Sequence, residues 1–161
     1  MQPAVRVRLV DVPVALFCAA EQHTNDLLRE VALMAAARPD LEPGHLFGEM
    51  LSTADTYANR PAAVRRRVTE SVIAALANGW DTVTVDVEAD EPAAEATRAW
   101  EELLRRFDGM SRDEQLLTLP AEPEVVAYRA WYVRELVEQV RTGRSPIGWT
   151  AARDAALAGA R

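Results

Sequence analysis

The segment Pro123–Arg141 carries the strongest structural signal in the sequence, because its apolar residues recur at the spacing of one helix face. Pro123 suits the first position of a helix, where its missing N–H costs no hydrogen bond. Gly143 suits the left-handed position that follows a helix. The apolar face comprises Val125, Val126, Tyr132, Val133, Leu136, Val137 and Val140. The segment is therefore predicted to be a long helix with one face against the core.

Two residues of this segment break its pattern. Arg129 projects from the apolar face and Trp131 from the polar face. Because an isolated buried charge is costly, Arg129 is predicted to form a structural ion pair, to reach water at the end of its stem, or to contact an anion or a partner protein. Trp131 is predicted either to be covered by the C-terminal tail, through Trp149 or Ile147, or to anchor an interface.

Two segments alternate between apolar and polar residues, which is typical of strands with one buried face. They are Ala4–Val12 and Trp80–Glu88. If the two strands pair, the arginines of the first lie beside the acids of the second, and each such neighbour contributes about 0.2–1 kcal/mol. The residues concerned are Arg6, Arg8, Asp86 and Glu88. We expect this pairing, with Thr82 and Thr84 also on the exposed face.

Four more segments have the apolar spacing of helices. They are Val14–Ala37, Gly44–Ala58, a helix that begins at Pro61 and ends at Asn78-Gly79, and a helix that Asp90 or Glu91 caps and Gly109 closes. Ser111 and Glu114 match a capping box and predict a further short helical turn. The residues Leu116–Leu119 are predicted to continue that turn or to form a brief edge strand. Thr150 is predicted to cap a last turn that frays.

The expected fold class is helix-rich α+β, with a small sheet of two to three strands that about five helices cover on one face. A single domain is expected over residues 1–148, followed by a C-terminal tail over 149–161. The chain of 161 residues is long enough to build one core without disulfides.

Composition excludes several classes of protein. The net charge is −7 and the only basic run is Arg65-Arg66-Arg67, which argues against a nucleic-acid partner. No apolar run approaches the ~20 residues of a membrane span, so no membrane partner is expected. Cys18 is the only cysteine, which excludes an intrachain disulfide and is consistent with a cytoplasmic protein.

The usual catalytic motifs are absent from the sequence. The chain has no lysine, which excludes Schiff-base chemistry, and only two histidines, which exclude a histidine-rich metal site. Glu101-Glu102 precede Arg105-Arg106 by four residues and are predicted to form ordinary surface ion pairs. No cofactor, metal or catalytic residue is predicted, and the protein is not expected to be an enzyme.

His23 belongs to the densest polar group of the sequence, with Glu21, Asp26 and Glu30 on the first predicted helix. His23 and Asp26 are three residues apart and are expected to touch. The histidine is predicted to be a boundary residue in a solvated charge pair. The alternatives are a ligand-sensing or pH-titrating histidine and a phosphoacceptor.

Two stretches carry a family resemblance: the pattern of His23, Leu27, Leu28, Arg29 and Glu30, and the pattern of Tyr128, Arg129, Trp131 and Tyr132. They resemble an actinobacterial regulatory or sensory domain that accompanies anti-sigma-factor-type ATP-binding proteins of partner-switching pathways. The resemblance implies a non-enzymatic role in sigma-factor or stress signalling. The motifs of the ATP-binding module itself are absent, so ATP binding and kinase activity are not implied.

These observations predict a cytoplasmic regulatory domain that acts by contact with a protein partner of a signalling pathway, and a homodimer through exposed aromatic residues is a further expectation. The alternative is a sensor of a small anion, with a pocket between sheet and helices that holds Arg129 and His23 together. The candidate contact residues are His23, Tyr128, Arg129, Trp131, Tyr132 and Trp149.

Overall fold

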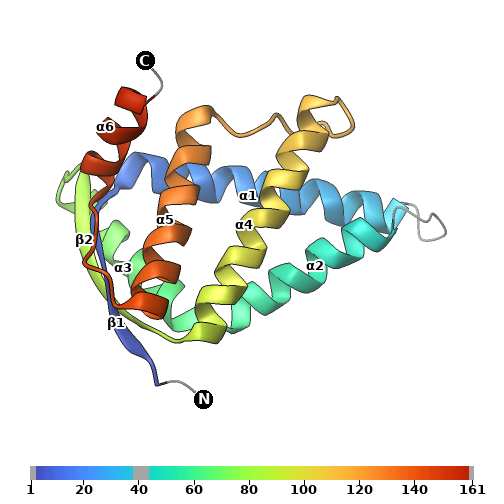
Figure 1. Cartoon of the computed structure of the whole chain (residues 1–161). Helices are drawn as coiled ribbons and strands as arrows, with labels where there is room; N and C mark the ends of the chain where they lie inside the picture. The colour runs from blue at the N-terminus through green and yellow to red at the C-terminus, as the bar shows by residue number, and fades with distance from the viewer. Residues whose placement is uncertain (1–2, 38–43, 160–161) are drawn as a thin grey trace.

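The computed structural model describes residues 3–37 and 44–159, and it confirms the helix-rich α+β fold class. The elements follow one another as β1 (Val5–Pro13), α1 (Val14–Ala37), α2 (Gly44–Asn59), α3 (Ala62–Ala77), β2 (Thr82–Ala89), α4 (Glu91–Arg112), α5 (Pro123–Thr142) and α6 (Trp149–Gly159) (Figure 1).

The two strands form one antiparallel sheet, as the alternation predicts. Arg6 lies opposite Glu88 and Arg8 opposite Asp86, and the Arg6 Nη2 atom lies 2.7 Å from Asp86 Oδ2. The expected pairing of basic and acidic residues on the exposed face is therefore confirmed. A bulge between Leu9 and Val12 bends β1 beside the start of α1.

The helices pack in two layers on one side of this sheet. Helices α3 and α5 contact the strands, and α1 crosses behind α5 and α4 (Figure 1). The core consequently divides into two clusters. One joins the strands to α3, α5 and the beginning of α1, and the other joins the rest of α1 to α2 and α4.

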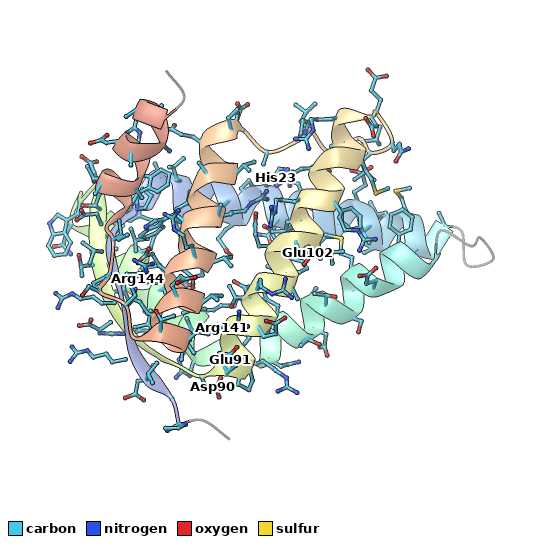
Figure 2. The ribbon with its side chains drawn as sticks, viewed as in Figure 1. His23, Asp90, Glu91, Glu102, Arg141 and Arg144 are labelled. Atoms are coloured by element: carbon cyan, nitrogen blue, oxygen red, sulfur yellow. The ribbon has the colours of Figure 1, made fainter. Side chains whose placement is uncertain are left out.

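The predicted start of helix α4 is confirmed, whereas its predicted end is not. The Asp90 side chain accepts a hydrogen bond from the Ala93 backbone N–H at 2.9 Å, so the predicted cap is confirmed (Figure 2). The predicted end at Gly109 is wrong, because the helix continues to Arg112 and buries Ser111. The capping box at Ser111 does not form, and Glu114 instead turns the chain with a φ of 58°. No strand forms over Leu116–Leu119 in the described chain.

The exposed surface between α4 and α5 is held by ion pairs. Arg141 Nε lies 2.6 Å from Glu91 Oε1, and Arg141 Nη2 lies 3.1 Å from Glu95 Oε2 (Figure 2). Such exposed pairs contribute about 0–1 kcal/mol each.

The C-terminal segment returns to the core. The helix α5 ends at Gly143, which has a φ of 65°, and Trp149 at the start of α6 is buried. Trp149 contacts the rings of Tyr128 and Trp131 edge-on, with centroids 6.0 and 5.8 Å apart. None of the described helices is both long enough and apolar enough to span a bilayer.

Candidate functional site

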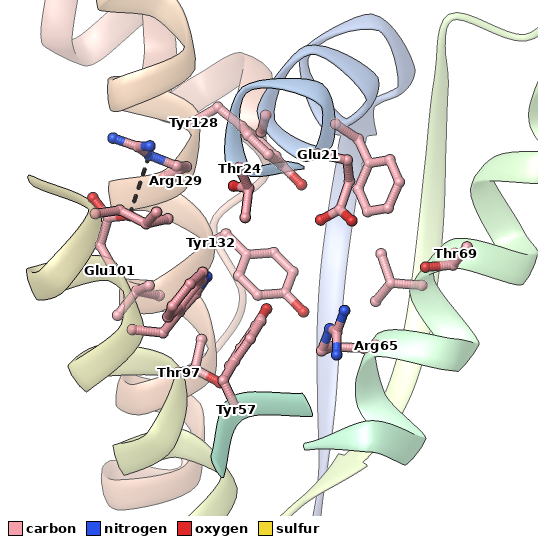
Figure 3. Close-up of a pocket in the computed structure, with 16 residues that line it drawn as sticks. Glu21, Thr24, Tyr57, Arg65, Thr69, Thr97, Glu101, Tyr128, Arg129 and Tyr132 are labelled. Carbon is pink, nitrogen blue, oxygen red and sulfur yellow. Dashed lines mark ion pairs between the residues drawn. The ribbon is translucent and has the colours of Figure 1, made fainter. Parts of the chain in front are cut away.

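A cavity of about 60 Å³ lies between the helices, with its opening toward α1 and α3 (Figure 3). A space of this volume holds about four to six water molecules. Helices α1, α3, α4 and α5 and the end of α2 line it, so it lies among the helices and not between the sheet and the helices as the sensor hypothesis expected. Its polar lining residues are Glu21, Thr24, Tyr57, Arg65, Thr69, Thr97, Glu101, Tyr128, Arg129 and Tyr132.

The lining residues divide into a mouth and a floor. The mouth comprises Glu21 and Thr69, which are exposed, and Arg65, which is half-buried. The floor comprises residues that are almost wholly buried: Trp100, Glu101, Tyr128 and Arg129. A small molecule can therefore contact charged groups at the mouth and aromatic walls further in.

All three tyrosines of the chain line this cavity. Burial raises the pKa of Tyr57 to about 12 and raises the pKa values of Tyr128 and Tyr132 further. Among the hydrogen bonds of the described residues, none involves a tyrosine hydroxyl. The tyrosines are therefore protonated at neutral pH, and their hydroxyls are free to donate to a ligand.

We expect no tyrosine of the folded protein to ionise near pH 10, where unfolded tyrosine titrates. Because the folded pKa values are raised, their contribution to stability is present below pH 10 and is lost as the pH rises through about 12. The absorbance of tyrosinate, followed against pH, measures this directly, with the urea-unfolded protein as the control. Ionisation of tyrosines near pH 10 in the folded protein would show that burial does not raise their pKa values.

A buried charge cluster forms the wall behind the floor. Arg129 Nε lies 3.2 Å from Glu101 Oε2, and Arg129 Nη2 donates a hydrogen bond to Asp108 Oδ2. The side chains of all three residues are at most 6% exposed. Arg129 therefore belongs to a structural ion-pair cluster, which is one of the alternatives that the sequence left open. Its guanidinium has two carboxylate partners, so it is not a free site for an anion.

Burial raises the pKa of the Glu101 carboxyl to about 7, while Arg129 and Arg105 act in the opposite direction and Asp108 adds to the rise. Two buried carboxylates share one buried guanidinium, so a second negative charge is poorly compensated. The prediction of Glu101 as a surface residue is wrong, since only 5% of its side chain is exposed.

The wild type should lose stability relative to Glu101→Gln as the pH rises from 4.5 through 7, because the folded protein holds the Glu101 proton more tightly than the unfolded chain. The stability that the Glu101 proton contributes to the wild type should be fully present below pH 4.5. It should fall by up to about 3 kcal/mol as the pH rises, at about 1.4 kcal/mol for each pKa unit. Urea denaturation across this range measures it. The control is Glu102→Gln, an exposed neighbour. Parallel pH profiles for the wild type and both variants would contradict the shift.

The cluster also holds the chain between α4 and α5 in place. Asp108 Oδ1 accepts a hydrogen bond from the Ala121 N–H at 3.1 Å. His23 Nε2 lies 3.0 Å from the Leu119 carbonyl oxygen and 3.4 Å from Asp108 Oδ1. Since a carbonyl only accepts, Nε2 is the donor in this hydrogen bond. Glu30 binds the N–H groups of Leu117 and Thr118 at 2.6 and 2.7 Å.

His23 does not contact Asp26 as the spacing predicted. Asp26 accepts from the Gln22 side chain and pairs with Arg29, whereas His23 turns inward to Asp108. The prediction that His23 belongs to a solvated charge pair is therefore wrong, because only 12% of its side chain is exposed and its partner Asp108 is buried. Arg129 lines the cavity and His23 lines a separate groove of about 650 Å³ between α1 and the segment after α4. The expectation that they share one cavity is wrong, although both reach Asp108.

The aromatic candidates lie in the interior. Trp131 is 2% exposed and donates its Nε1–H to the Ile147 carbonyl at 2.8 Å. The C-terminal tail therefore covers Trp131, through both Trp149 and Ile147. The alternative prediction, that Trp131 is an exposed anchor of an interface, is wrong for this conformation. Tyr128 and Trp149 are buried with it, and Tyr132 faces the cavity.

The sequence analysis did not identify three residues of this region as candidates: Arg65, which it considered only as part of a basic run, Tyr57 and Asp108. One signal for the last was present. Glu101 and Asp108 are seven residues apart, and Leu104 lies between them, so all three share one face of α4. Acids in register with a core leucine indicate a buried partner, which Arg129 supplies.

Searches against protein-family models, curated proteins and solved structures gave no match. The resemblance to an actinobacterial regulatory domain therefore stays a prediction. In the part of the chain that the structure describes, no three histidine, cysteine or acidic side chains gather closely enough to hold a metal ion.

Proposed function

We propose that the protein is a non-enzymatic regulatory domain that senses a small polar molecule, which it binds in the cavity between its helices. One observation carries the proposal: a preformed aromatic cavity is lined by Glu101 and Arg129, whose buried Oε1 and Nη1 atoms have no hydrogen-bond partner within the described protein. Ligand sites are typically apolar hollows with a few placed polar groups. A small-molecule sensor is also the alternative function that the sequence predicts. The cavity proposed here lies among the helices instead of between sheet and helices, and its lining does not include His23.

The chemistry of the lining favours recognition. The tyrosine hydroxyls keep their protons at neutral pH, because burial raises their pKa values above the ordinary value for tyrosine. Arg129 already has two carboxylate partners, which keep its guanidinium in place. Fixed donors and a fixed floor give a site that requires little reorganisation on binding.

A thermal-shift screen of small polar metabolites tests the proposal. At least one class should raise the melting temperature of the wild type, and Ala20→Met should abolish the rise, because Ala20 is buried in the cavity wall and a larger side chain fills the space. The matched control is Ala15→Met, an exposed position of the same helix. No stabilising molecule, or the same response from Ala20→Met as from Ala15→Met, would contradict the proposal.

The protein partner, the homodimer and the sigma-factor pathway stay predictions, and their contact residues need revision. Of the exposed apolar side chains, Leu33, Leu117 and Leu119 border the groove beside His23. The polar contacts of Asp108 join this segment to the wall of the cavity. A pull-down that compares the wild type with Leu117→Ser should locate a partner contact here. Equal retention by both would exclude the segment.

A further inference from the structure

Two opposite charges face one another across the mouth of the cavity. Glu21 projects from α1 and Arg65 from α3 (Figure 3). Within the described residues they form no ion pair with each other, and neither forms a hydrogen bond to another side chain. Burial raises the pKa of the Glu21 carboxyl, and the Arg65 guanidinium is close enough to oppose part of that rise. The space between them is therefore flanked by one anion and one cation.

Arg65 is held in its position by the aromatic wall. Its guanidinium lies over the Tyr57 ring, 4.8 Å from the centroid. The same ring stacks on Trp100, with centroids 5.5 Å apart and an angle of 11° between the planes. The cation at the mouth is thus anchored to the core through two rings, which fixes where a negative group can bind.

Hydroxyl donors converge on the same place. In Figure 3 the Tyr132 hydroxyl points toward the Arg65 guanidinium, the Tyr57 hydroxyl ends beside that of Tyr132, and the Glu21 carboxylate lies across the opening from them. One guanidinium and two protonated hydroxyls match the acceptor atoms of a carboxylate. The Glu21 carboxylate on the other side matches the donors of an ammonium group.

We propose that the mouth binds a small zwitterion, an α-amino acid of the size of glycine, alanine or serine. Its carboxylate contacts Arg65, Tyr57 and Tyr132, and its ammonium group contacts Glu21. Its short side chain points into the aromatic cavity, whose 60 Å³ holds about four to six water-sized groups. This inference rests on the proposed function and names the class of molecule that the site takes.

A ligand with a single charge fits less well. A simple anion would satisfy Arg65 but would lie close to the Glu21 carboxylate. A simple cation would satisfy Glu21 but would lie beside the Arg65 guanidinium, and the ring of Tyr57 already has Arg65 and Trp100 against it. A molecule that carries both charges avoids both repulsions.

Isothermal titration calorimetry with glycine, L-alanine and L-serine tests the inference, with two capped analogues as the deciding arms. L-Alanine methyl ester keeps the ammonium group and lacks the carboxylate, and N-acetyl-L-alanine keeps the carboxylate and lacks the ammonium group. We expect each analogue to bind about tenfold or more weakly than L-alanine, because each leaves one charged group of the site unpaired. Equal binding by either analogue would overturn the zwitterion and assign the site to a cation or to an anion.

Variants of the two mouth residues give an independent readout. Arg65→Gln and Glu21→Gln should each weaken L-alanine binding about tenfold or more, while the exposed controls Arg66→Gln and Glu70→Gln leave it unchanged. Unchanged binding by the mouth variants would overturn the inference. If none of the three amino acids binds but another molecule stabilises the protein in an Ala20-dependent manner, the zwitterion is wrong and the proposed function stands. If no molecule stabilises it, both fail.

Discussion

Replacing Arg129 with methionine should lower the free energy of unfolding by about 3–5 kcal/mol, the usual loss when one member of a buried ion pair is removed. The change leaves Glu101 and Asp108 buried together without the guanidinium that separates and compensates them. Urea denaturation, monitored by circular dichroism, measures the loss. The effect should be large because both acids are at most 5% exposed and have little access to water.

The control for this prediction is Arg98→Met, which removes an arginine from exposed pairs with Glu95 and Glu102 on α4. Its cost should stay below about 1 kcal/mol, since exposed pairs contribute little. Adding Asp108→Asn to Arg129→Met should restore part of the stability by removing one uncompensated charge. A loss for Arg129→Met no larger than that for Arg98→Met would show that the cluster is not a buried one.

Replacing Trp149 with alanine should also cost about 3–5 kcal/mol, because a large buried ring leaves a cavity that the core cannot close. Trp149 packs edge-on against Tyr128 and Trp131, and it is 5% exposed. Its loss detaches the start of α6 from β1 and α5 and removes the cover of Trp131. Chemical denaturation gives the free energy, and hydrogen exchange over Tyr128–Tyr132 shows whether α5 loosens.

Leu157→Ala serves as the control within the same helix. Leu157 is 56% exposed, so its truncation should change stability by no more than about 0.5 kcal/mol. Similar small losses for both variants would mean that α6 is only loosely attached. The tail would then leave Trp131 uncovered for part of the time, and the interface reading of that residue would return.

The local patterns of the sequence identified the elements well. The helix predicted over Val14–Ala37 has those bounds in the structure, because Pro13 precedes it and its apolar spacing continues to its end. The pairing of β1 with β2 followed from alternation and from complementary charges. The helix is decided by neighbours within about ten residues, which a sequence displays. The strands are far apart in the chain, but each shows its own alternation and their exposed charges are complementary.

The site was harder to predict because it depends on which helices meet. Helix α4 lies between α5 and α2, so its buried surface is wider than its apolar stripe and includes Glu101 and Asp108. Nothing local to Arg65 or Tyr57 indicates that α3 and the end of α2 border one cavity. A residue such as Trp131 looked exposed on its own helix, and only the returning tail covers it.

The location of a bound ligand tests the account most directly. Because the chain has only three tyrosines and all of them line the cavity, every signal in NMR spectra of protein with ¹³C-labelled tyrosine comes from the cavity wall. The protein is titrated with the most stabilising molecule of the thermal-shift screen. We predict that the ring signals of Tyr57, Tyr128 and Tyr132 shift together and saturate at the stoichiometry of one ligand. Binding that leaves all three signals unchanged would contradict the cavity as the site.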